Sequence, residues 1–363
     1  MKTALVVFPD EWLPYCPTIL NIVQSLREEG WSVKVIAVDN NRFEGAVLKD
    51  VDICYIKINP LLVSVLEKFR VYKFYVFYKF LKMCFCLSSF KKINYDLVFG
   101  VDPLGFIAAR LFFRKVIYLS LEIRKDLLLT IARFLGINSL IIQTPAREKY
   151  LLGDYSYKSK TFYIQNAPIL KGDRLIPNRS GYRLIYLGTI IPSHGVEHCI
   201  KVLRLLDGNY TLTLKGVIFD KYREFLLDKY QDVFNEGRLF IDNKYVPQDG
   251  VVKYLVQYDI GFCFYNFEII ESGDFNYISA PSGKLFNYYA AGVPVIGTSI
   301  LGLQSVTEFH AGVLLERMES KEILKAIKEI KGSYEMYANN AIKAAQHYDF
   351  KKSFDHFLNG TID

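Results

Sequence analysis

The chain has 363 residues, with 45 Lys and Arg against 38 Asp and Glu, which gives a net charge of +7 at neutral pH. A hydrophobic share of 51% with 23% charged residues excludes a disordered chain, and the length favours two domains over one core. The six cysteines show no metal-ligand spacing and no compact framework, so we expect a reducing compartment and a cytoplasmic protein.

Strand-like and helix-like segments alternate from the first residues. The opening "TALVVF" is shorter than the core of a signal peptide and is followed by Pro9-Asp10-Glu11, so it predicts a buried first strand. Helical and strand patterns then follow in turn as far as "SLIIQT". This alternation predicts a mostly parallel sheet with helices on both faces.

The segment 67–92 of this first half is unusually basic and aromatic, with seven Lys and Arg, nine aromatic residues and one acidic residue. Such a mixture suits an anionic membrane surface, where basic side chains reach the headgroups. On a helix, Lys68, Lys79 and Lys82 fall together and two other basic residues fall nearly opposite. We therefore keep two interpretations, a peripheral membrane contact and a partly buried helix with a solvated face.

The alternation restarts after a segment rich in Pro, Gly and Asn at about 166–181. We predict two doubly wound Rossmann-like α/β domains that face each other across a cleft, with ligands at the carboxyl ends of the strands. The predicted division is 1–168, 169–345 and a C-terminal helix at 346–363 that packs back on the first domain. The longest run without a charge is cut by Gly and Pro, so no transmembrane segment is expected.

The stretch "SAPSGKLFNYYAAGVPVIGTS", residues 279–299, carries the clearest chemical signal. Its Pro and Gly residues mark a loop, Ser282 suits a helix N-cap, and a short helix at 285–291 ends before Gly292. A loop of small residues that opens a helix exposes unpaired N–H groups at the positive end of the helix dipole, where phosphates bind. The stretch therefore predicts a diphosphate site.

Several other kinds of site are not supported. There is no G-x-G-x-x-G after the first strand, no G-x-x-x-x-G-K-[ST] loop and no G-x-S-x-G elbow. His194 and His198 are four residues apart but have no adjacent third ligand, and Asp50-Val-Asp52 is most simply a surface turn. We expect neither a bound metal nor a cofactor.

The same stretch resembles the segment P-S-K-L-F-E-Y-M-A-A-G-x-P-V-I of nucleotide-sugar glycosyltransferases with the GT-B fold, in particular the retaining glycosyltransferase family 4. "PTILNIVQSLREEGWSVKVIAV", "LIYLGTIIPSHGVEHCIKVLRLL", "GRLFIDNKYVPQDGVVKYLVQYDIGFCFY" and "HYDFKKSFDHFL" resemble further segments of that family, from the first helix to the closing helix. The resemblance implies an N-terminal acceptor-binding domain and a C-terminal domain that binds a nucleoside diphosphate sugar as substrate.

The resemblance also implies a donor site. The diphosphate would rest on the helix start, the base against the residues at 245 and 246, and the ribose near residue 287. Lys284 would be catalytic as well, because its charge would stabilise the leaving diphosphate; a solvent-facing Lys284 is the alternative. The expected donor-binding residues are Gly188, Thr189, His194, Gly195, Lys215, Tyr245, Val246, Ser282, Gly283, Lys284 and Asn287.

The chain departs from the family pattern at charged positions. Thr189 and His194 stand where family members usually carry Arg and Lys; Thr is neutral, and His194 can help only when protonated. Either Lys284 and Lys215 take over, or catalysis is weak.

Two further departures replace glutamates. Asn287 stands in place of the ribose-binding Glu, and Ser279 in place of another Glu of the family. A carboxylate from the preceding loop is a candidate to contact the sugar, against the alternative of a solvated acidic loop: Glu268, Glu271 or Asp274.

A catalytic base would have to come from the N-terminal domain, where no histidine precedes residue 194. Glu11 and Glu122 follow predicted strands and are the candidates, with Asp102 as a third. A retaining transfer without an enzymic base fits this composition better than an inverting one.

The sequence thus predicts a glycosyltransferase of the hexosyltransferase type. It would move a sugar, with retention and without a metal, from a nucleoside diphosphate sugar to a hydroxyl of a glycan or lipid-linked acceptor in surface polysaccharide biosynthesis. We expect it in the cytoplasm or peripheral on the inner face of the cytoplasmic membrane, with no nucleic-acid partner. The alternatives are a catalytically degenerate binding subunit, favoured by the lost charges, and a nucleotide-sugar epimerase of the same architecture.

Overall fold

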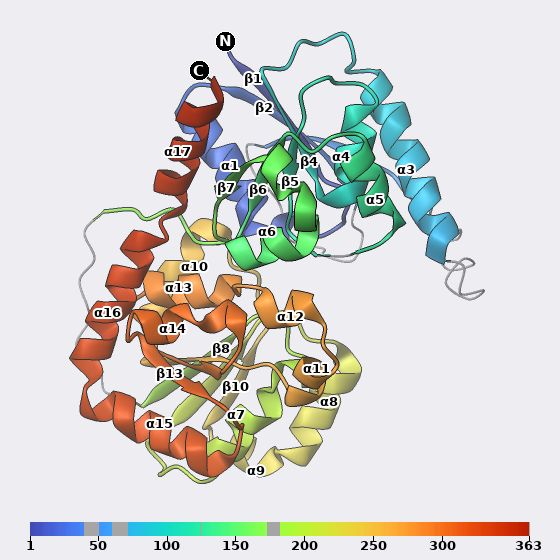
Figure 1. Cartoon of the computed structure of the whole chain (residues 1–363). Coiled ribbons are helices and arrows are strands. Elements are labelled where there is room, and N and C mark those ends of the chain that lie inside the picture. The colour runs from blue at the N-terminus through green and yellow to red at the C-terminus, as the bar shows by residue number, and fades with distance from the viewer. Residues whose placement is uncertain (40–50, 60–71, 124, 173–181, 363) are drawn as a thin grey trace. The chain divides into compact units, whose positions relative to one another are not determined.

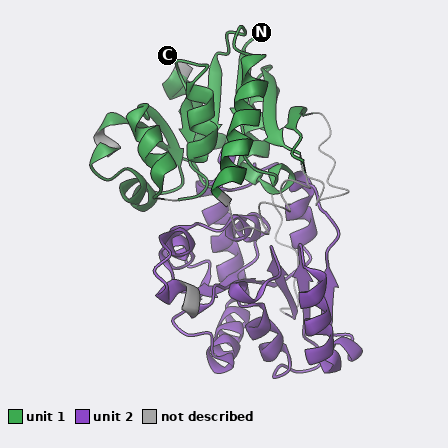
Figure 2. Ribbon diagram, turned by 90° about the vertical axis from the view of Figure 1, so that its right-hand side faces the viewer, with its two compact units in different colours: residues 1–165, 351–363 green, residues 166–350 purple. Residues whose placement is uncertain are grey.

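The structure is a computed structural model that describes residues 1–362 apart from 40–50, 60–71, 124 and 173–181 (Figure 1). The chain divides into two compact units (Figure 2). Unit 1 comprises residues 1–165 and 351–363, and unit 2 comprises residues 166–350.

Unit 1 is built on a seven-stranded sheet in which every pairing is parallel, in the order β3-β2-β1-β4-β5-β6-β7. The strand order reverses between β1 and β4, and both strands are almost entirely buried. The strands are β1 (Thr3–Val7), β2 (Ser32–Val38), β3 (Asp52–Ile56), β4 (Leu97–Val101), β5 (Ile117–Leu119), β6 (Ser139–Ile142) and β7 (Lys160–Tyr163).

Helices cover this sheet, and one of them comes from the far end of the chain. The ring of Phe357 on the last helix lies 5.1 Å from that of Phe162 and 5.9 Å from that of Phe99, so this helix completes the core of unit 1. The described helices of unit 1 are η1 (Leu13–Tyr15), α1 (Pro17–Glu28), α3 (Tyr72–Ser88), α4 (Asp102–Arg110), α5 (Leu127–Phe134), α6 (Pro145–Leu152), η2 (Gly153–Lys158) and α17 (Phe350–Ile362).

Helix α3 corrects one detail of the sequence interpretation. Lys79, expected on a basic face with Lys82, is buried: its ammonium donates to Pro9 O at 3.0 Å and lies 3.4 Å from Asp10 Oδ1. The reason is that the segment after β1 offers a carbonyl and a carboxylate to an ammonium that would otherwise be desolvated without a partner. The rest of the predicted basic segment before Tyr72, including Lys68, lies outside the described residues, as does Asp50.

Unit 2 contains a six-stranded sheet, again paired in parallel throughout, in the order β10-β9-β8-β11-β12-β13. The order reverses between β8 and β11, as it does in unit 1 between β1 and β4, so the predicted class of two doubly wound α/β domains is confirmed. The strands are β8 (Arg183–Leu187), β9 (Thr211–Lys215), β10 (Leu239–Asp242), β11 (Ile260–Cys263), β12 (Val295–Thr298) and β13 (Gly312–Leu315).

The helices of unit 2 alternate with these strands. They are η3 (Pro192–His194), α7 (Val196–Leu203), α8 (Asp220–Lys229), α9 (Gln231–Asn235), α10 (Gln248–Leu255), α11 (Phe267–Glu271), α12 (Phe275–Ser279), α13 (Gly283–Ala290), η4 (Leu301–Leu303), α14 (Ser305–Glu308), α15 (Ser320–Gly332) and α16 (Tyr334–His347).

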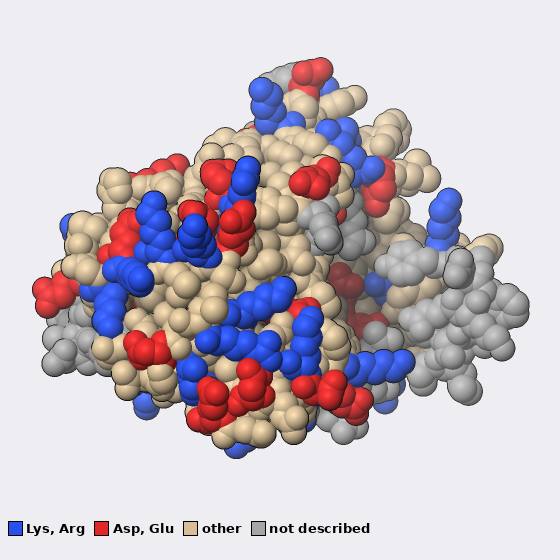
Figure 3. Space-filling model, turned by 90° about the horizontal axis from the view of Figure 1, so that it is seen from below, with Lys and Arg blue, Asp and Glu red and all other residues tan. Residues whose placement is uncertain are grey.

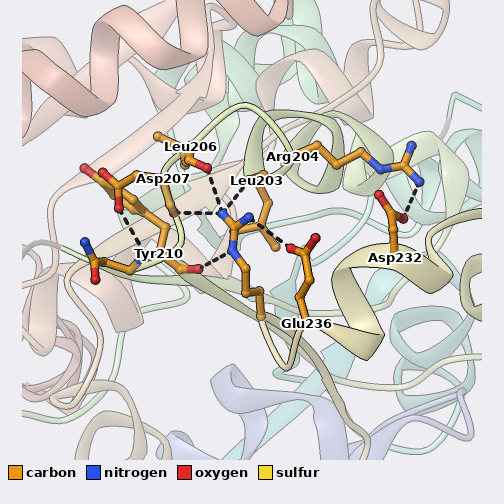
Figure 4. A network of polar contacts seen from close by, with 9 residues as sticks. Leu203, Arg204, Leu206, Asp207, Tyr210, Asp232 and Glu236 are labelled. Atoms are coloured by element: carbon orange, nitrogen blue, oxygen red, sulfur yellow. Dashed lines mark hydrogen bonds and ion pairs between the residues drawn. The ribbon is translucent and has the colours of Figure 1, made fainter.

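Figure 4 shows a network of polar contacts at the end of α7, in which Leu203, Leu206 and Tyr210 are labelled. Arg238, just before β10, donates through Nη2 to the carbonyls of Leu203 at 2.7 Å and Leu206 at 3.0 Å, and through Nε to Tyr210 O at 3.1 Å. Leu203 is the last residue of α7, and Leu206 and Tyr210 lie in the connection to β9, so one side chain holds three points of this connection.

Charge is mixed on the face seen from below in Figure 3, where Lys and Arg side chains stand beside Asp and Glu side chains. All six cysteines are free, and Cys54 Sγ lies 3.2 Å from Cys86 Sγ. Within the described residues, no helix combines the length and the apolar character needed to span a membrane.

Candidate active site

The predicted diphosphate stretch forms α13 at the carboxyl end of the sheet of unit 2, close to the point where the strand order reverses. Tyr288 on this helix ties it to β8, because its hydroxyl accepts the backbone N–H of Leu187 at 2.8 Å. Ser282 occupies the N-cap as predicted, but its side chain makes no capping bond. Its hydroxyl instead interacts with the thiol of Cys263. The first N–H groups of α13 are therefore not satisfied by this side chain, which suits an anion at the helix start.

Lys284, in the first turn of α13, lies among aromatic rings. Its Nζ is 4.4 Å from the ring centroid of Tyr186 and 5.6 Å from that of Tyr265, and it donates to the Tyr186 hydroxyl at 3.2 Å. Burial lowers the pKa of Lys284, and no carboxylate forms an ion pair with it within the described part of the chain. An ammonium that is partly desolvated and lacks a counter-charge is a strong attractor for an anion.

The glycine loop after β8 reaches this lysine. Gly188 has φ of +125°, and a Cβ at that position would lie 3.4 Å from both Cε and Nζ of Lys284. A side chain there would be strained by the positive φ and would touch the lysine. Thr189 follows, and its carbonyl accepts the Tyr186 hydroxyl at 2.8 Å. The structure thus brings Gly188 and Thr189 together with Lys284.

His194 joins the same cluster, but without a charge. Its Nδ1 lies 3.0 Å from the Tyr186 hydroxyl and 3.0 Å from Thr189 O. Burial and the nearby charge of Lys284 lower the pKa of His194 to about 4, so the imidazole is neutral near pH 7. Gly195 follows in the left-handed conformation, at φ of +64°, as the N-cap of α7. His194 therefore does not replace the lost positive charge at neutral pH.

Lys215, the other residue expected to supply charge, has its own counter-ion. Its Nζ lies 2.9 Å from Asp242 Oδ1 and donates to Lys244 O at 2.6 Å. It thereby holds the loop between β10 and α10 that contains Tyr245 and Val246. Donor-binding roles for these three residues stay predictions.

Asn287 and Ser279 stand where the resemblance leads us to expect glutamates, and each donates to a backbone carbonyl of its own helix. Asn287 is buried, its Nδ2 donates to Gly283 O at 3.0 Å, and its Oδ1 has no partner among the described residues. Ser279 is buried and donates to Phe275 O at 2.6 Å. Neither side chain does the work of a carboxylate.

The carboxylates of the acidic loop before α13 have different environments. Asp274 caps α12 by accepting the N–H of Asn276 at 2.9 Å. Glu271 is exposed at the end of α11. The side chain of Glu268 lies outside the described part. A sugar contact through Glu271 stays a prediction.

In unit 1 the third candidate, Asp102, has a more unusual environment than Glu11 or Glu122. Asp102, at the start of α4, adopts a left-handed φ of +52°, and its Oδ1 accepts the N–H groups of Leu121 at 2.8 Å and Glu122 at 3.1 Å. Burial, followed by the charge of Glu122, raises its pKa to about 7. Glu11 accepts the hydroxyl of Tyr75 at 2.8 Å. Strained backbone and a pKa near neutrality are both features of functional carboxylates.

The segment after β5 that contains Leu121 and Glu122 also accepts a hydrogen bond from a residue that the sequence did not suggest. Arg147 on α6 is buried and donates through Nη2 to Leu121 O at 2.9 Å. Burial lowers its pKa to about 10, although Glu122 and Asp102 favour the charged form. No local pattern distinguishes this arginine from its solvated neighbours in a helix.

Unit 1 does contain a histidine, because α17 belongs to it. The ring of His356 lies 6.2 Å from that of Phe162. The absence of histidine before residue 194 therefore does not extend to the whole of unit 1. Among the described residues, no three His, Cys, Asp or Glu side chains are grouped so that they could hold a metal ion.

No protein-family model matches this sequence, and no curated protein sequence does either. Solved structures do resemble it along almost the whole chain. WaaG, a glycosyltransferase involved in lipopolysaccharide biosynthesis, is 14% identical with a TM-score of 0.64, covering 99% of this chain and 100% of WaaG. Anabaena HepE in complex with UDP-glucose is 14% identical with a TM-score of 0.66, covering 99% of both chains.

A third similar structure is the pneumococcal O-GlcNAc transferase GtfA in complex with UDP and GlcNAc. It is 10% identical with a TM-score of 0.67, covering 99% of this chain and 98% of GtfA. At such low identity these similarities establish the fold. The chain therefore has the GT-B fold of two Rossmann-like domains, as its sequence predicted.

Proposed function

We propose that this protein is a glycosyltransferase that moves a sugar from a nucleoside diphosphate sugar to a hydroxyl of a glycan or lipid-linked acceptor, in the biosynthesis of a surface polysaccharide. The GT-B fold and the glycosyltransferase names of the similar structures support the reaction class. Two of those structures contain UDP with a sugar or as a sugar nucleotide, which supports a donor of that class.

The observation that carries the proposal is the ammonium of Lys284 at the start of α13. It has no carboxylate counter-ion among the described residues, it lies against Tyr186 and Tyr265, and the uncapped helix start is beside it. Departure of a nucleoside diphosphate creates negative charge on phosphate oxygens. A fixed cation and helix N–H groups stabilise that charge more in the transition state than in the bound donor. This arrangement also supports our proposal that the reaction needs no metal.

We further propose that transfer proceeds with retention and that the acceptor is met at a membrane surface. Retention is supported by the resemblance to family 4 and by the absence of histidine before residue 194. Proton NMR of the first product formed decides it: an anomeric configuration opposite to that of the donor would refute retention. The membrane contact is supported by the basic and aromatic composition of residues 67–92.

Nucleoside diphosphate release tests the proposal directly. The protein is incubated with UDP-, GDP-, dTDP- and ADP-sugars and with membrane extract as the source of acceptor, and the Lys284→Met variant is the control. We expect release with one donor, dependent on extract and lost in the variant. Release that survives in the variant would refute the role of Lys284, and no release with any donor would refute transfer under these conditions.

A second function has a specific observation in its favour. His194 is neutral and Lys215 is neutralised by Asp242, so two of the three basic groups expected around the diphosphate contribute no free charge at neutral pH. A binding subunit without turnover would fit these facts. Saturable binding of a nucleotide sugar by calorimetry, combined with no release for every donor and extract, would favour this subunit over the enzyme.

A further inference from the structure

Helix α3 exposes a row of large apolar side chains. Phe74, Phe77, Leu81 and Phe85 are spaced three and four residues apart, which places them on one side of a helix. All four are exposed, and Phe85 is 79% exposed. The opposite side of the helix faces the protein, where Met83 and Leu87 are fully buried. The exposed row is therefore a surface feature and not a misplaced part of the core.

Helix α5 has the same feature, and its sequence did not draw attention. Leu127, Ile131 and Phe134 recur at four and three residues, again on one side of the helix. Leu127 is 75% exposed and Phe134 is 90% exposed, whereas Leu129 and Ala132 on the other side are buried. Isolated exposed apolar residues need no explanation, but two helical rows of them in one unit do.

The two helices that carry these rows share a neighbour. Both α3 and α5 pack against α4, and the three helices lie beside one another in Figure 1. The residues of α4 from Pro103 to Ala109 are all buried, because the sheet and the two neighbouring helices enclose this helix. Helices α3 and α5 are thus the outer layer over α4. We name their exposed apolar residues the α3–α5 surface: Phe74, Phe77, Leu81, Phe85, Leu127, Ile131 and Phe134.

Lysines predominate among the charged residues around this surface. No Asp or Glu occurs between residues 72 and 92, while Lys73, Lys82, Lys91 and Lys92 are exposed there. Helix α5 contains no carboxylate either, and the Asp126 before it accepts the N–H of Leu129 as the N-cap. Lysines with long apolar stems next to exposed Phe and Leu match the boundary of an anionic bilayer, where the rings enter the headgroup region and the ammonium groups reach phosphates.

We propose that the α3–α5 surface docks on an anionic lipid bilayer, with α5 as an anchor equal in importance to α3. This inference rests on the membrane contact of the proposed function and extends it from residues 67–92 to a second helix. Two apolar rows fix the orientation of unit 1 on the surface. A single row would leave the unit free to rotate about the line of that row. The partner is the lipid surface itself, since anionic headgroups supply the negative charge that would balance these lysines.

Flotation with vesicles tests this docking without any donor or turnover. Vesicles of phosphatidylglycerol and phosphatidylcholine are compared with vesicles of phosphatidylcholine alone, using Leu127→Gln with Phe134→Gln for α5 and Phe77→Gln with Phe85→Gln for α3. A matched control changes Leu205→Gln and Phe219→Gln in unit 2, which are 61% and 60% exposed. Lys73→Gln with Lys82→Gln tests the electrostatic part.

We expect the wild type to float with anionic vesicles, each apolar double variant to bind about tenfold more weakly or worse, and the control to bind like the wild type. The lysine variant should bind more weakly and depend less on salt. Full binding by the α5 variant, or equal binding to both kinds of vesicle, would overturn the proposal. So would light scattering that finds a dimer without vesicles which the α5 variant abolishes, since the surface would then serve a second copy of the chain.

Failure of this proposal is distinguishable from failure of the transferase function. A protein that floats but releases no nucleoside diphosphate keeps the docking surface and loses the enzyme. A protein that transfers sugar in solution but does not bind anionic vesicles keeps the enzyme and loses the docking surface. Circular dichroism of each variant verifies that its helices are intact before binding is compared.

Discussion

Replacing Lys284 by Met separates a functional lysine from a structural one, because the two roles predict opposite changes in stability. Met keeps the length and apolar stem and still packs against the rings of Tyr186 and Tyr265. It removes an ammonium whose pKa burial has lowered and which no carboxylate compensates among the described residues. We therefore expect Lys284→Met to unfold at a temperature no lower than the wild type, while its activity is lost.

The size of each effect follows from the contacts. Removing one fixed donor to a developing oxyanion typically costs about 100- to 1,000-fold in rate, or about 3–4 kcal/mol. For stability the sign is set by linkage: the folded state binds the Lys284 proton less tightly than the unfolded chain does. The charged lysine thus costs free energy near pH 7, and that cost shrinks only as pH rises toward 10.5. Loss of the cation–π contact, about 1–2 kcal/mol, offsets part of the gain.

The assay pairs nucleoside diphosphate release with thermal unfolding, each with and without the donor that supports release. Lys331→Met is the matched control, because Lys331 Nζ also lies over a tyrosine ring, 3.7 Å from the centroid of Tyr182, but on the exposed face of α15. The control should keep its activity and its stabilisation by donor, and Lys284→Met should lose both. If Lys284→Met instead unfolds several degrees lower and retains turnover, the lysine is structural and our reasoning about the site is wrong.

Three further predictions concern titration and packing. Because the pKa of His194 falls from 6.5 to about 4 on folding, the free energy of unfolding should drop as pH is lowered through that window, by up to roughly 3 kcal/mol, and His194→Asn should lose that dependence in urea titrations. Asp102 has the opposite sign: its pKa rises from 3.8 to about 7, so stability should fall as pH rises through that window. Asp102→Asn keeps an acceptor for the N–H groups of Leu121 and Glu122 and tolerates a positive φ, so it should gain about 2 kcal/mol at pH 8, whereas Asp102→Ala should not. Arg238→Met removes the guanidinium that donates to the carbonyls of Leu203, Leu206 and Tyr210, and should cost about 2–4 kcal/mol in chemical denaturation. Arg223→Met, at an exposed position of α8, should stay within about 0.5 kcal/mol of the wild type.

Local patterns were sufficient to predict the helices and strands and the start of α13 in the candidate site. The helix after Ser282 runs from Gly283 to Ala290, close to the predicted 285–291, and the predicted strand after Pro294 is β12. These features depend on residues only a few positions apart: a glycine loop, a capping position, a short apolar run. The same is true of the two doubly wound sheets, since alternating strand and helix patterns leave few other topologies.

The environment of each charged group depended on residues far along the chain. Lys284 and Tyr186, whose hydroxyl links the lysine to His194, are 98 residues apart, and Lys79 finds Pro9 O across 70 residues. A lysine written in a sequence looks the same whether its charge is free, as at Lys284, or neutralised, as at Lys215 by Asp242. The exposed rows of α3 and α5 likewise became visible only when packing against α4 decided which side of each helix is buried.

The sequence by itself therefore determined the fold class, the division into strands and helices, and the helix start that suits a diphosphate, because each is a property of short-range pattern. Tertiary structure alone decided which lysine keeps an unbalanced charge, that His194 is neutral, that Asp102 titrates near neutrality, and which apolar side chains face water. The physical reason is that pKa and exposure are set by whatever surrounds a group in space, and the chain brings those surroundings together from segments that carry no local record of one another.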